Sequence, residues 1–197
     1  MEKEQKKRCD VMVDIETLST NKAQGLIVEV AMVPFDITNG SELEVENGMT
    51  FSVKVLESLL SGRVVDESTL QWWKGQSAEA KERLLRNENV AKGVKEGCEE
   101  LYSKLKELDE KYDLWVWSKG IGFDFPMIES QWEDLGIMHT PYKFWKKLDM
   151  RTVLNMASMM GWQKKQKRED IRHGAYEDCV DQIAVLWDAL GYVKAGR

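Results

Sequence analysis

The sequence contains little cysteine, histidine or proline, and it has no long apolar run. Its 197 residues include three cysteines, three prolines and two histidines. An odd number of widely spaced cysteines argues against a disulfide framework or a structural zinc site. The best apolar run, residues 26–35, is shorter than the roughly 20 residues of a membrane helix and includes Glu29. The N-terminal segment lacks the apolar core of a signal peptide, so we expect a cytoplasmic protein that does not enter membranes.

Acidic residues outnumber basic ones by 34 to 28, which gives a formal net charge of −6. This balance excludes a strongly basic nucleic-acid coat protein, but a protein whose carboxylates hold cations can be acidic overall and still bind phosphates locally. The 43% of hydrophobic residues is typical of a globular chain, and the length suits one domain. We therefore expect residues 1–197 to form a single domain, with residues 1–9 as a flexible N-terminal tail.

Apolar runs and alternating patterns predict several strands and helices in a mixed order. The expected strands cover residues 11–13, 26–35, 49–55, 114–117 and 144–148. Two or three helices are expected between residues 66 and 109, followed by helices over residues 124–135, 151–160 and 176–190. This order of elements indicates an α/β fold in which helices cover a single sheet.

Carboxylates recur where the predicted strands and helices meet. Asp14 and Glu16 are two residues apart at the end of a strand, so their side chains point to the same face. Asp124 follows another strand, where α/β folds usually place ligands. Asp178 lies in the opening turns of the last helix, five positions after His173. Oxygen ligands from separate elements select Mg²⁺ or Mn²⁺ over zinc, and such a site supports metal-assisted phosphoryl transfer to water.

Each of these residues also has an ordinary structural explanation. An aspartate after a strand is most often a turn or helix-capping residue, and a lone histidine is most often a surface or packing residue. Only the order and spacing of the five residues together favour a functional site.

The five residues resemble the motifs of the DEDDh group of DnaQ-like 3′–5′ exonucleases. The first motif, Asp-x-Glu-Thr, is similar to the segment from Asp14 to Thr17, and the third, His-x₄-Asp, to the segment from His173 to Asp178. The middle motif is matched by the stretch that ends at Asp124. Within the group, residues 68–76 and 149–152 are similar to the branch of phage exonuclease A and the mycobacterial exoribonuclease-like domains.

The resemblance implies an RNase H-like fold with a single mixed five-stranded sheet flanked by helices. It implies a 3′–5′ exonuclease that releases nucleoside 5′-monophosphates from single-stranded nucleic acid or from 3′ overhangs. It also implies two divalent cations, Mg²⁺ or Mn²⁺, held by Asp14, Glu16, Asp124 and Asp178. His173 would be the general base, and Thr17 and Leu18 would contact the terminal nucleotide.

A basic stretch and a tryptophan pair are further candidates for substrate binding. A charged run is normally a solvated loop, but this one directly precedes His173, and a strand entering an acidic site needs cations along its approach. We therefore predict phosphate contacts from Lys164, Lys165, Lys167 and Arg168. Adjacent tryptophans cannot share one helix face, so one member of the pair Trp72 and Trp73 is a candidate for the substrate groove.

A second hypothesis is a non-catalytic nucleic-acid-binding or proofreading-like module on the same fold. The complete set of four carboxylates and one histidine favours the enzyme. The expected partners are 3′ ends of single-stranded DNA or RNA, and the sequence leaves the choice of sugar open because no group can be placed against the 2′-hydroxyl. A homodimer is the expectation for this group, although no heptad pattern supports it.

Overall fold

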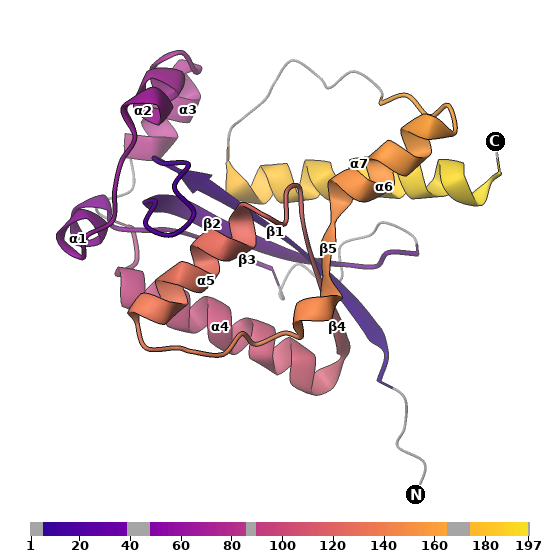
Figure 1. Ribbon diagram of the computed structural model, residues 1–197, viewed down its shortest axis with the longest axis horizontal. Coiled ribbons are helices and arrows are strands. Elements are labelled where there is room, and N and C mark those ends of the chain that lie inside the picture. Colours follow the sequence, from indigo (N-terminus) through magenta and orange to yellow (C-terminus); the bar gives the residue numbers. More distant parts are fainter. Residues whose placement is uncertain (1–5, 39–47, 86–89, 165–173, 197) are drawn as a thin grey trace, which may run out of the picture.

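A five-stranded mixed sheet lies at the centre of the computed structural model (Figure 1). The structure describes residues 6–38, 48–85, 90–164 and 174–196, without the side chains of residues 83–85. The strand order is β3-β2-β1-β4-β5. Strand β1 pairs antiparallel with β2 and parallel with β4, while β2–β3 is antiparallel and β4–β5 parallel. The strands are β1 (Arg8–Thr17), β2 (Ile27–Phe35), β3 (Met49–Ser52), β4 (Asp113–Ser118) and β5 (Lys147–Asp149).

Helices cover both faces of this sheet, which confirms the predicted α/β architecture. Helices α4 and α5 lie on one face, α6 and α7 on the other, and α1 to α3 at one end (Figure 1). None of the helices in the described ranges is long and apolar enough to cross a membrane. The helices are α1 (Val55–Leu60), α2 (Glu67–Lys74), α3 (Ala78–Leu85), α4 (Val94–Lys111), α5 (Asp124–Asp134), the 3₁₀ turn η2 (Phe144–Lys146), α6 (Met150–Met159) and α7 (Ala175–Lys194).

The central strand β1 divides its side chains between the two layers of the core. Val11, Val13 and Ile15 are buried with residues of α4 and α5. Met12 is buried with residues of α7, and the Cys179 thiol donates to its carbonyl oxygen at 3.6 Å. Because side chains alternate along a strand, the other even-numbered residues of β1 also face the α7 layer.

Three predicted boundaries were wrong. Strand β1 begins at Arg8 and Cys9 is buried, so a tail over residues 1–9 is too long by two residues. The third strand ends at Ser52 and α1 begins at Val55, because the chain leaves β2 after Val53, whose amide still donates to the Val28 carbonyl, and the amide of Lys54 donates instead to the carbonyl of Lys92.

The last strand is also shorter than predicted. Residues 144–146 form the turn η2, in which the aromatic side chains of Phe144 and Trp145 are exposed. Only Lys147–Asp149 pairs with β4. Aromatic residues favour strands in general, but here both side chains are largely exposed to solvent.

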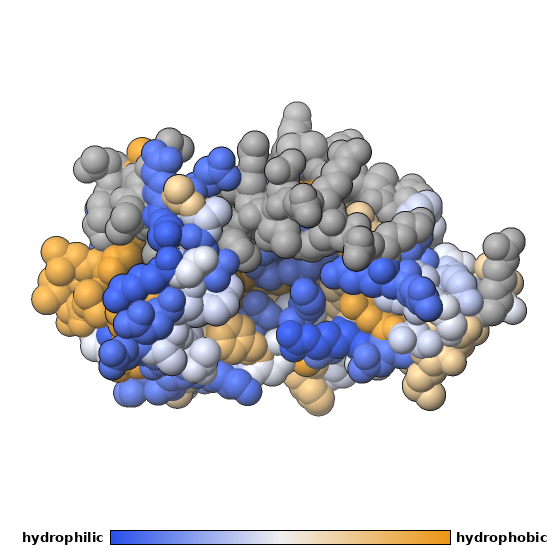
Figure 2. Space-filling view, turned by 90° about the horizontal axis from the view of Figure 1, so that it is seen from above, coloured by the Kyte–Doolittle hydropathy of each residue, from blue (hydrophilic) through white to orange (hydrophobic). Residues whose placement is uncertain are grey.

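The molecular surface differs strongly from one end to the other. Figure 2 shows apolar side chains gathered at the α1 end, where Leu56, Leu59 and Leu60 are exposed. Hydrophilic side chains dominate the middle of the same view.

Candidate active site

Asp14 and Glu16 lie at the carboxyl end of β1. Both are partly buried, whereas their neighbours Val13 and Ile15 are buried in the opposite layer. The pairing of β1 with β2 shifts its register between Glu16 and Thr17, so the regular strand ends there. The alternation of side chains along β1 thus brings both carboxylates to the α7 face of the sheet.

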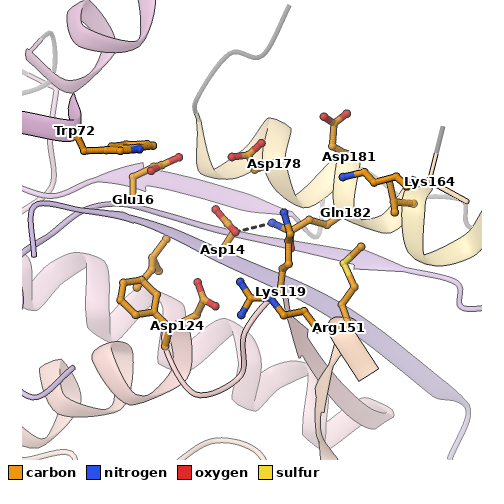
Figure 3. A pocket seen from close by; sticks show the side chains of 14 residues that line it. Asp14, Glu16, Trp72, Lys119, Asp124, Arg151, Lys164, Asp178, Asp181 and Gln182 are labelled. Atoms are coloured by element: carbon orange, nitrogen blue, oxygen red, sulfur yellow. Dashed lines mark hydrogen bonds between the residues drawn. The ribbon is translucent and has the colours of Figure 1, made fainter. Parts of the chain in front are cut away.

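Asp124 reaches the same place from the loop that follows β4. It is the first residue of α5 and is only 5% exposed. The loop turns sharply at Gly120, whose φ of 126° lies in the region that favours glycine. The Phe123 amide donates to the Gly120 carbonyl at 2.7 Å. This turn positions the Asp124 carboxylate toward Asp14 (Figure 3).

Asp178 and Gln182 lie one helical turn apart on α7 and point toward the end of β1 (Figure 3). The Gln182 amide donates to Asp14 Oδ1 at 2.6 Å. One carboxylate oxygen from each of Asp14, Glu16 and Asp178 can be chosen so that all three atoms lie within 4.8 Å of one another. Oxygen atoms at this spacing could hold a hard divalent cation.

Glu29 fixes the beginning of α7 against the sheet. It lies on β2 directly opposite Glu16. Its Oε2 accepts the amide proton of Ala175, the first residue of α7, at 3.3 Å, and its Oε1 accepts the Thr50 hydroxyl at 3.4 Å. Gly174 has no side chain with which to cap the helix, and a carboxylate at a helix N-terminus is stabilising. Glu29 therefore holds the helix that presents Asp178.

Two of the carboxylates, Asp14 and Asp124, have raised pKa values. The pKa of Asp14 lies well above its ordinary value, first because of burial and then because of the negative charge of Asp124, while the Gln182 hydrogen bond opposes the shift. Burial raises the pKa of Asp124 to about 6, and the positive charge of Arg151 is among the effects that oppose this shift. A cation among these groups would favour their ionised forms.

The carboxylates line a pocket of about 480 Å³ (Figure 3). Trp72 stands above Glu16 at one end of the pocket, whereas cationic side chains lie toward the other end. The remaining lining side chains that matter for binding are those of Lys119, Phe123, Arg151, Lys164 and Asp181. An acidic centre thus lies between an aromatic end and a basic end.

A second pocket, of about 400 Å³, adjoins the aromatic end and is lined by Thr17, Trp72 and Trp73 together with residues of α2. Trp73 is buried and its indole donates to the Thr17 carbonyl at 2.9 Å. Trp72 is 50% exposed, and its ring lies edge-on to that of Trp73 with the centroids 5.1 Å apart. Of the two tryptophans, Trp72 is the one that faces the groove.

The structure brings together most of the predicted site residues that it describes. Asp14, Glu16, Asp124 and Asp178 line one pocket, and Lys164 lines it as well. Leu18 is buried beside Trp73 in a small apolar cluster. The remaining predicted residues lie outside the described part of the chain, namely Lys165, Lys167, Arg168 and His173.

Several pocket residues were not predicted from the sequence, among them Gln182, Lys119 and Arg151. Gln182 lies four positions after Asp178, and this helical spacing could have indicated a shared face. Lys119 and Arg151 belong to separate elements that meet only in the folded protein, and no sequence pattern connects them.

Comparison with known proteins places these features in a family. A family model described as "3'-5' exoribonuclease Rv2179c-like domain" matches residues 9–189. An exodeoxyribonuclease of Enterobacteria phage T4 is 23% identical over 207 residues, covering 93% of this chain and 89% of the phage protein. These matches confirm the predicted relation to 3′–5′ exonucleases and to the phage enzyme.

Two solved structures share the fold at low sequence identity. Cell-death related nuclease 4 (CRN-4) is 14% identical with a TM-score of 0.63, over 93% of this chain and 64% of that chain. E. coli Exonuclease I in complex with a dA16 oligonucleotide is 12% identical with a TM-score of 0.68, over 96% of this chain and 45% of that chain. The chain thus spans less than two thirds of either nuclease. Because the family model matches nearly the whole chain, the chain belongs to the Rv2179c-like 3′–5′ exoribonuclease domain family.

Proposed function

We propose that the protein is a metal-dependent exonuclease that releases nucleoside 5′-monophosphates from the 3′ ends of single-stranded nucleic acid or 3′ overhangs. The observation that supports this most strongly is the set of oxygen atoms from Asp14, Glu16 and Asp178 within 4.8 Å of one another. The donors are all carboxylate oxygens, which suits Mg²⁺ or Mn²⁺. The like charges that raise the pKa of Asp14 are the environment that a cation would stabilise.

The four carboxylates would hold two divalent cations. Asp14, Glu16 and Asp178 would bind one of them, and Asp14 together with Asp124 would bind the other. When bound, such ions polarise the scissile phosphate and lower the pKa of the attacking water. Gln182 would keep Asp14 in a fixed orientation, because its amide donates to one carboxylate oxygen and leaves the other available.

His173 would act as the general base that removes a proton from the attacking water. A histidine with an ordinary pKa near 6.5 is suited to this role at neutral pH. The residue itself lies outside the described ranges, and in the sequence it directly precedes Gly174, the N-cap residue of α7. Its proposed role therefore depends on the motif and on its place in the sequence.

The 3′-terminal nucleotide would bind at the aromatic end of the pocket. The exposed face of Trp72 offers a stacking surface for a base, worth about 1 to 3 kcal/mol, and Thr17 lines the adjoining pocket. Lys164 and the basic residues that follow it would contact backbone phosphates. The related proteins are described with either sugar, as an exoribonuclease domain and an exodeoxyribonuclease, so the sugar preference has to be measured.

The test is degradation of 5′-labelled single-stranded DNA and RNA of one sequence with Mg²⁺, Mn²⁺ or EDTA. Asp14→Ala is the inactive variant, and Glu110→Ala, an exposed carboxylate on α4, is its matched control. We expect a ladder that shortens from the 3′ end, requires metal, and is absent only for Asp14→Ala. Full-length label under every condition would instead favour a nucleic-acid-binding module.

A cytoplasmic location is part of the proposal. It is supported by the three buried cysteines, which are all free thiols, because free thiols persist in a reducing compartment. The expected homodimer stays a prediction, which sedimentation of the purified protein would test.

A further inference from the structure

Two cations at the basic end of the pocket have no role in the proposed chemistry so far. Arg151 is the second residue of α6, and Lys119 lies in the loop between β4 and α5. Both side chains line the same pocket as the carboxylates. In Figure 3 they lie on the opposite side of Asp14 from Trp72. The pocket therefore has two distinguishable ends along which a strand could run.

The Arg151 side chain lies against the loop between β4 and α5. Asp149 accepts the backbone amide of Arg151 with Oδ1 at 2.8 Å and that of Ile121 with Oδ2 at 3.3 Å, which ties the start of α6 to the loop. A Cβ atom at Gly120 would lie 2.6 Å from Arg151 Nη1, so the guanidinium lies directly against the loop backbone. The glycine thus allows both the turn and the close approach of the arginine.

Arg151 differs from Arg8 and Arg63 in that its guanidinium is not paired with a carboxylate of the described residues. Arg8 binds Asp10 and Arg63 binds Asp134, both at 2.7 Å. Within the described ranges, Arg151 makes no ion pair and no side-chain hydrogen bond, and the same holds for Lys119. An exposed guanidinium of this kind is well suited to bind a phosphate with two parallel hydrogen bonds.

We propose that Arg151 and Lys119 form a subsite for the phosphate of the second linkage from the 3′ end, next to the scissile one. This inference rests on the proposed exonuclease function. With the terminal base against Trp72 and the scissile phosphate at the carboxylates, the strand continues past Asp14 over Gly120. The first uncleaved phosphate then meets the guanidinium, which fixes the direction of the strand through the pocket.

A competing role for Arg151 is purely local. Its positive charge lowers the pKa of Asp124, so its removal could impair the carboxylate cluster without any contact to substrate. The two roles differ in one measurable respect, because only a phosphate contact depends on the charge of that particular phosphate.

The experiment combines protein variants with a neutral phosphate analogue. The substrates are the unmodified oligonucleotide, one with a methylphosphonate at the second linkage from the 3′ end, and one with it at the fourth linkage. Removal of the terminal nucleotide is measured for the wild type, Arg151→Gln, Arg151→Lys and the control Lys106→Gln, an exposed lysine on α4. Thermal melting establishes that each variant is folded.

We expect Arg151→Gln to reduce kcat/KM for the unmodified strand by roughly 10- to 100-fold, the effect of one lost charged hydrogen bond. The methylphosphonate at the second linkage should cost the wild type a similar factor and should cost Arg151→Gln almost nothing more. Arg151→Lys should recover part of the loss, and the fourth-linkage analogue should act equally on all variants. Fully additive losses, or no loss in Arg151→Gln, would overturn the subsite.

A binding measurement separates this proposal from the proposed function. Fluorescence anisotropy of the same labelled strands in EDTA reports the contact without cleavage. If the wild type binds but leaves every strand intact with Mg²⁺ or Mn²⁺, the exonuclease assignment fails, while the dependence of affinity on Arg151 and on the second phosphate still decides the subsite.

Discussion

Two aspartates on β1 face the same side of the sheet but have opposite electrostatic surroundings. Asp10 and Asp14 flank Met12, and all three point into the α7 layer. Asp10 is 1% exposed, and its carboxylate accepts hydrogen bonds from Arg8 at 2.8 and 2.7 Å and from the Trp117 indole at 2.7 Å. The negative charge of Asp10 is therefore neutralised by the Arg8 guanidinium and further stabilised by the Trp117 indole.

Asp14 has no cationic side chain bonded to it within the described ranges. Its carboxylate receives the Gln182 amide, and the charges that act on it are those of Asp124, Glu16 and Asp178, all negative. Burying a carboxylate among like charges is costly unless a cation is supplied. The difference indicates that a buried aspartate paired with its own arginine is structural, whereas one surrounded by carboxylates is suited to bind a cation from solution.

The largest expected effect separates the two aspartates by activity. Asp14→Asn should reduce turnover on the order of 10³-fold or more, because the cations lose a ligand that both would share. Asp10→Asn should leave kcat within a few fold of the wild type. Single-turnover cleavage of a 5′-labelled strand at saturating Mg²⁺ measures both, and comparable losses in the two variants would remove the distinction.

The second prediction concerns the pH dependence of stability in the metal-free protein. Asp14 and Asp124 have raised pKa values, so the folded protein binds their protons more tightly than the unfolded chain. The free energy of unfolding should therefore fall as the pH rises from the ordinary value of 3.8 to about 6, by about 3 kcal/mol for Asp124 alone.

Divalent cations should reverse this loss. Added Mn²⁺ should raise the melting temperature more at about pH 8 than at about pH 5, because it binds the ionised carboxylates. Asp14→Asn should be more stable than the wild type without metal at the higher pH and should gain less from Mn²⁺. Calorimetry at both pH values measures these shifts, and equal Mn²⁺ effects at the two values would contradict the assignment.

The third prediction tests the structural aspartate. Asp10→Asn should lower the free energy of unfolding by about 2 kcal/mol, because it leaves the Arg8 guanidinium and the Trp117 indole with a weaker hydrogen-bond acceptor. The stabilisation of the protein by Mn²⁺ should stay unchanged. Urea unfolding with and without Mn²⁺ measures both quantities, and a lost Mn²⁺ effect would show that Asp10 also influences the cation site.

The smallest expected effect concerns Glu29, which holds the start of α7. Glu29→Ala removes the acceptor for the Ala175 amide and should weaken Mn²⁺ binding by about 1 kcal/mol, the typical value of a helix cap. Glu29→Gln retains an acceptor oxygen and should lose less. Titration calorimetry with Mn²⁺ compares the two variants, and equal affinities in Glu29→Ala and the wild type would show that α7 is positioned without this cap.

The sheet and the acidic cluster could be predicted because both depend on local patterns. The apolar runs located β1, β2 and β4 to within a few residues, and the spacing of Asp14 and Glu16 placed them on one face. The exit of the chain from the sheet after Val53 was missed because it depends on the contact of Lys54 with Lys92, which belongs to a distant segment.

The rest of the pocket required tertiary structure. The bond between Gln182 and Asp14 joins residues 168 positions apart, and Arg151 meets the loop at Gly120 only because α6 and β4 are neighbours in space. No periodicity or spacing in the sequence predicts these two long-range contacts. The role predicted for His173 stays a prediction, because it came from the motif alone.

The use of α7 as the source of both Asp178 and Gln182 has a consequence for the synthesis of the protein. This helix is the last of the described elements, so the ribosome completes it after the whole sheet. A nascent or prematurely ended chain that lacks α7 has the carboxylates of β1 and α5 but no complete cluster. The proposed cation site is therefore complete only when α7 has folded onto a sheet that is already made.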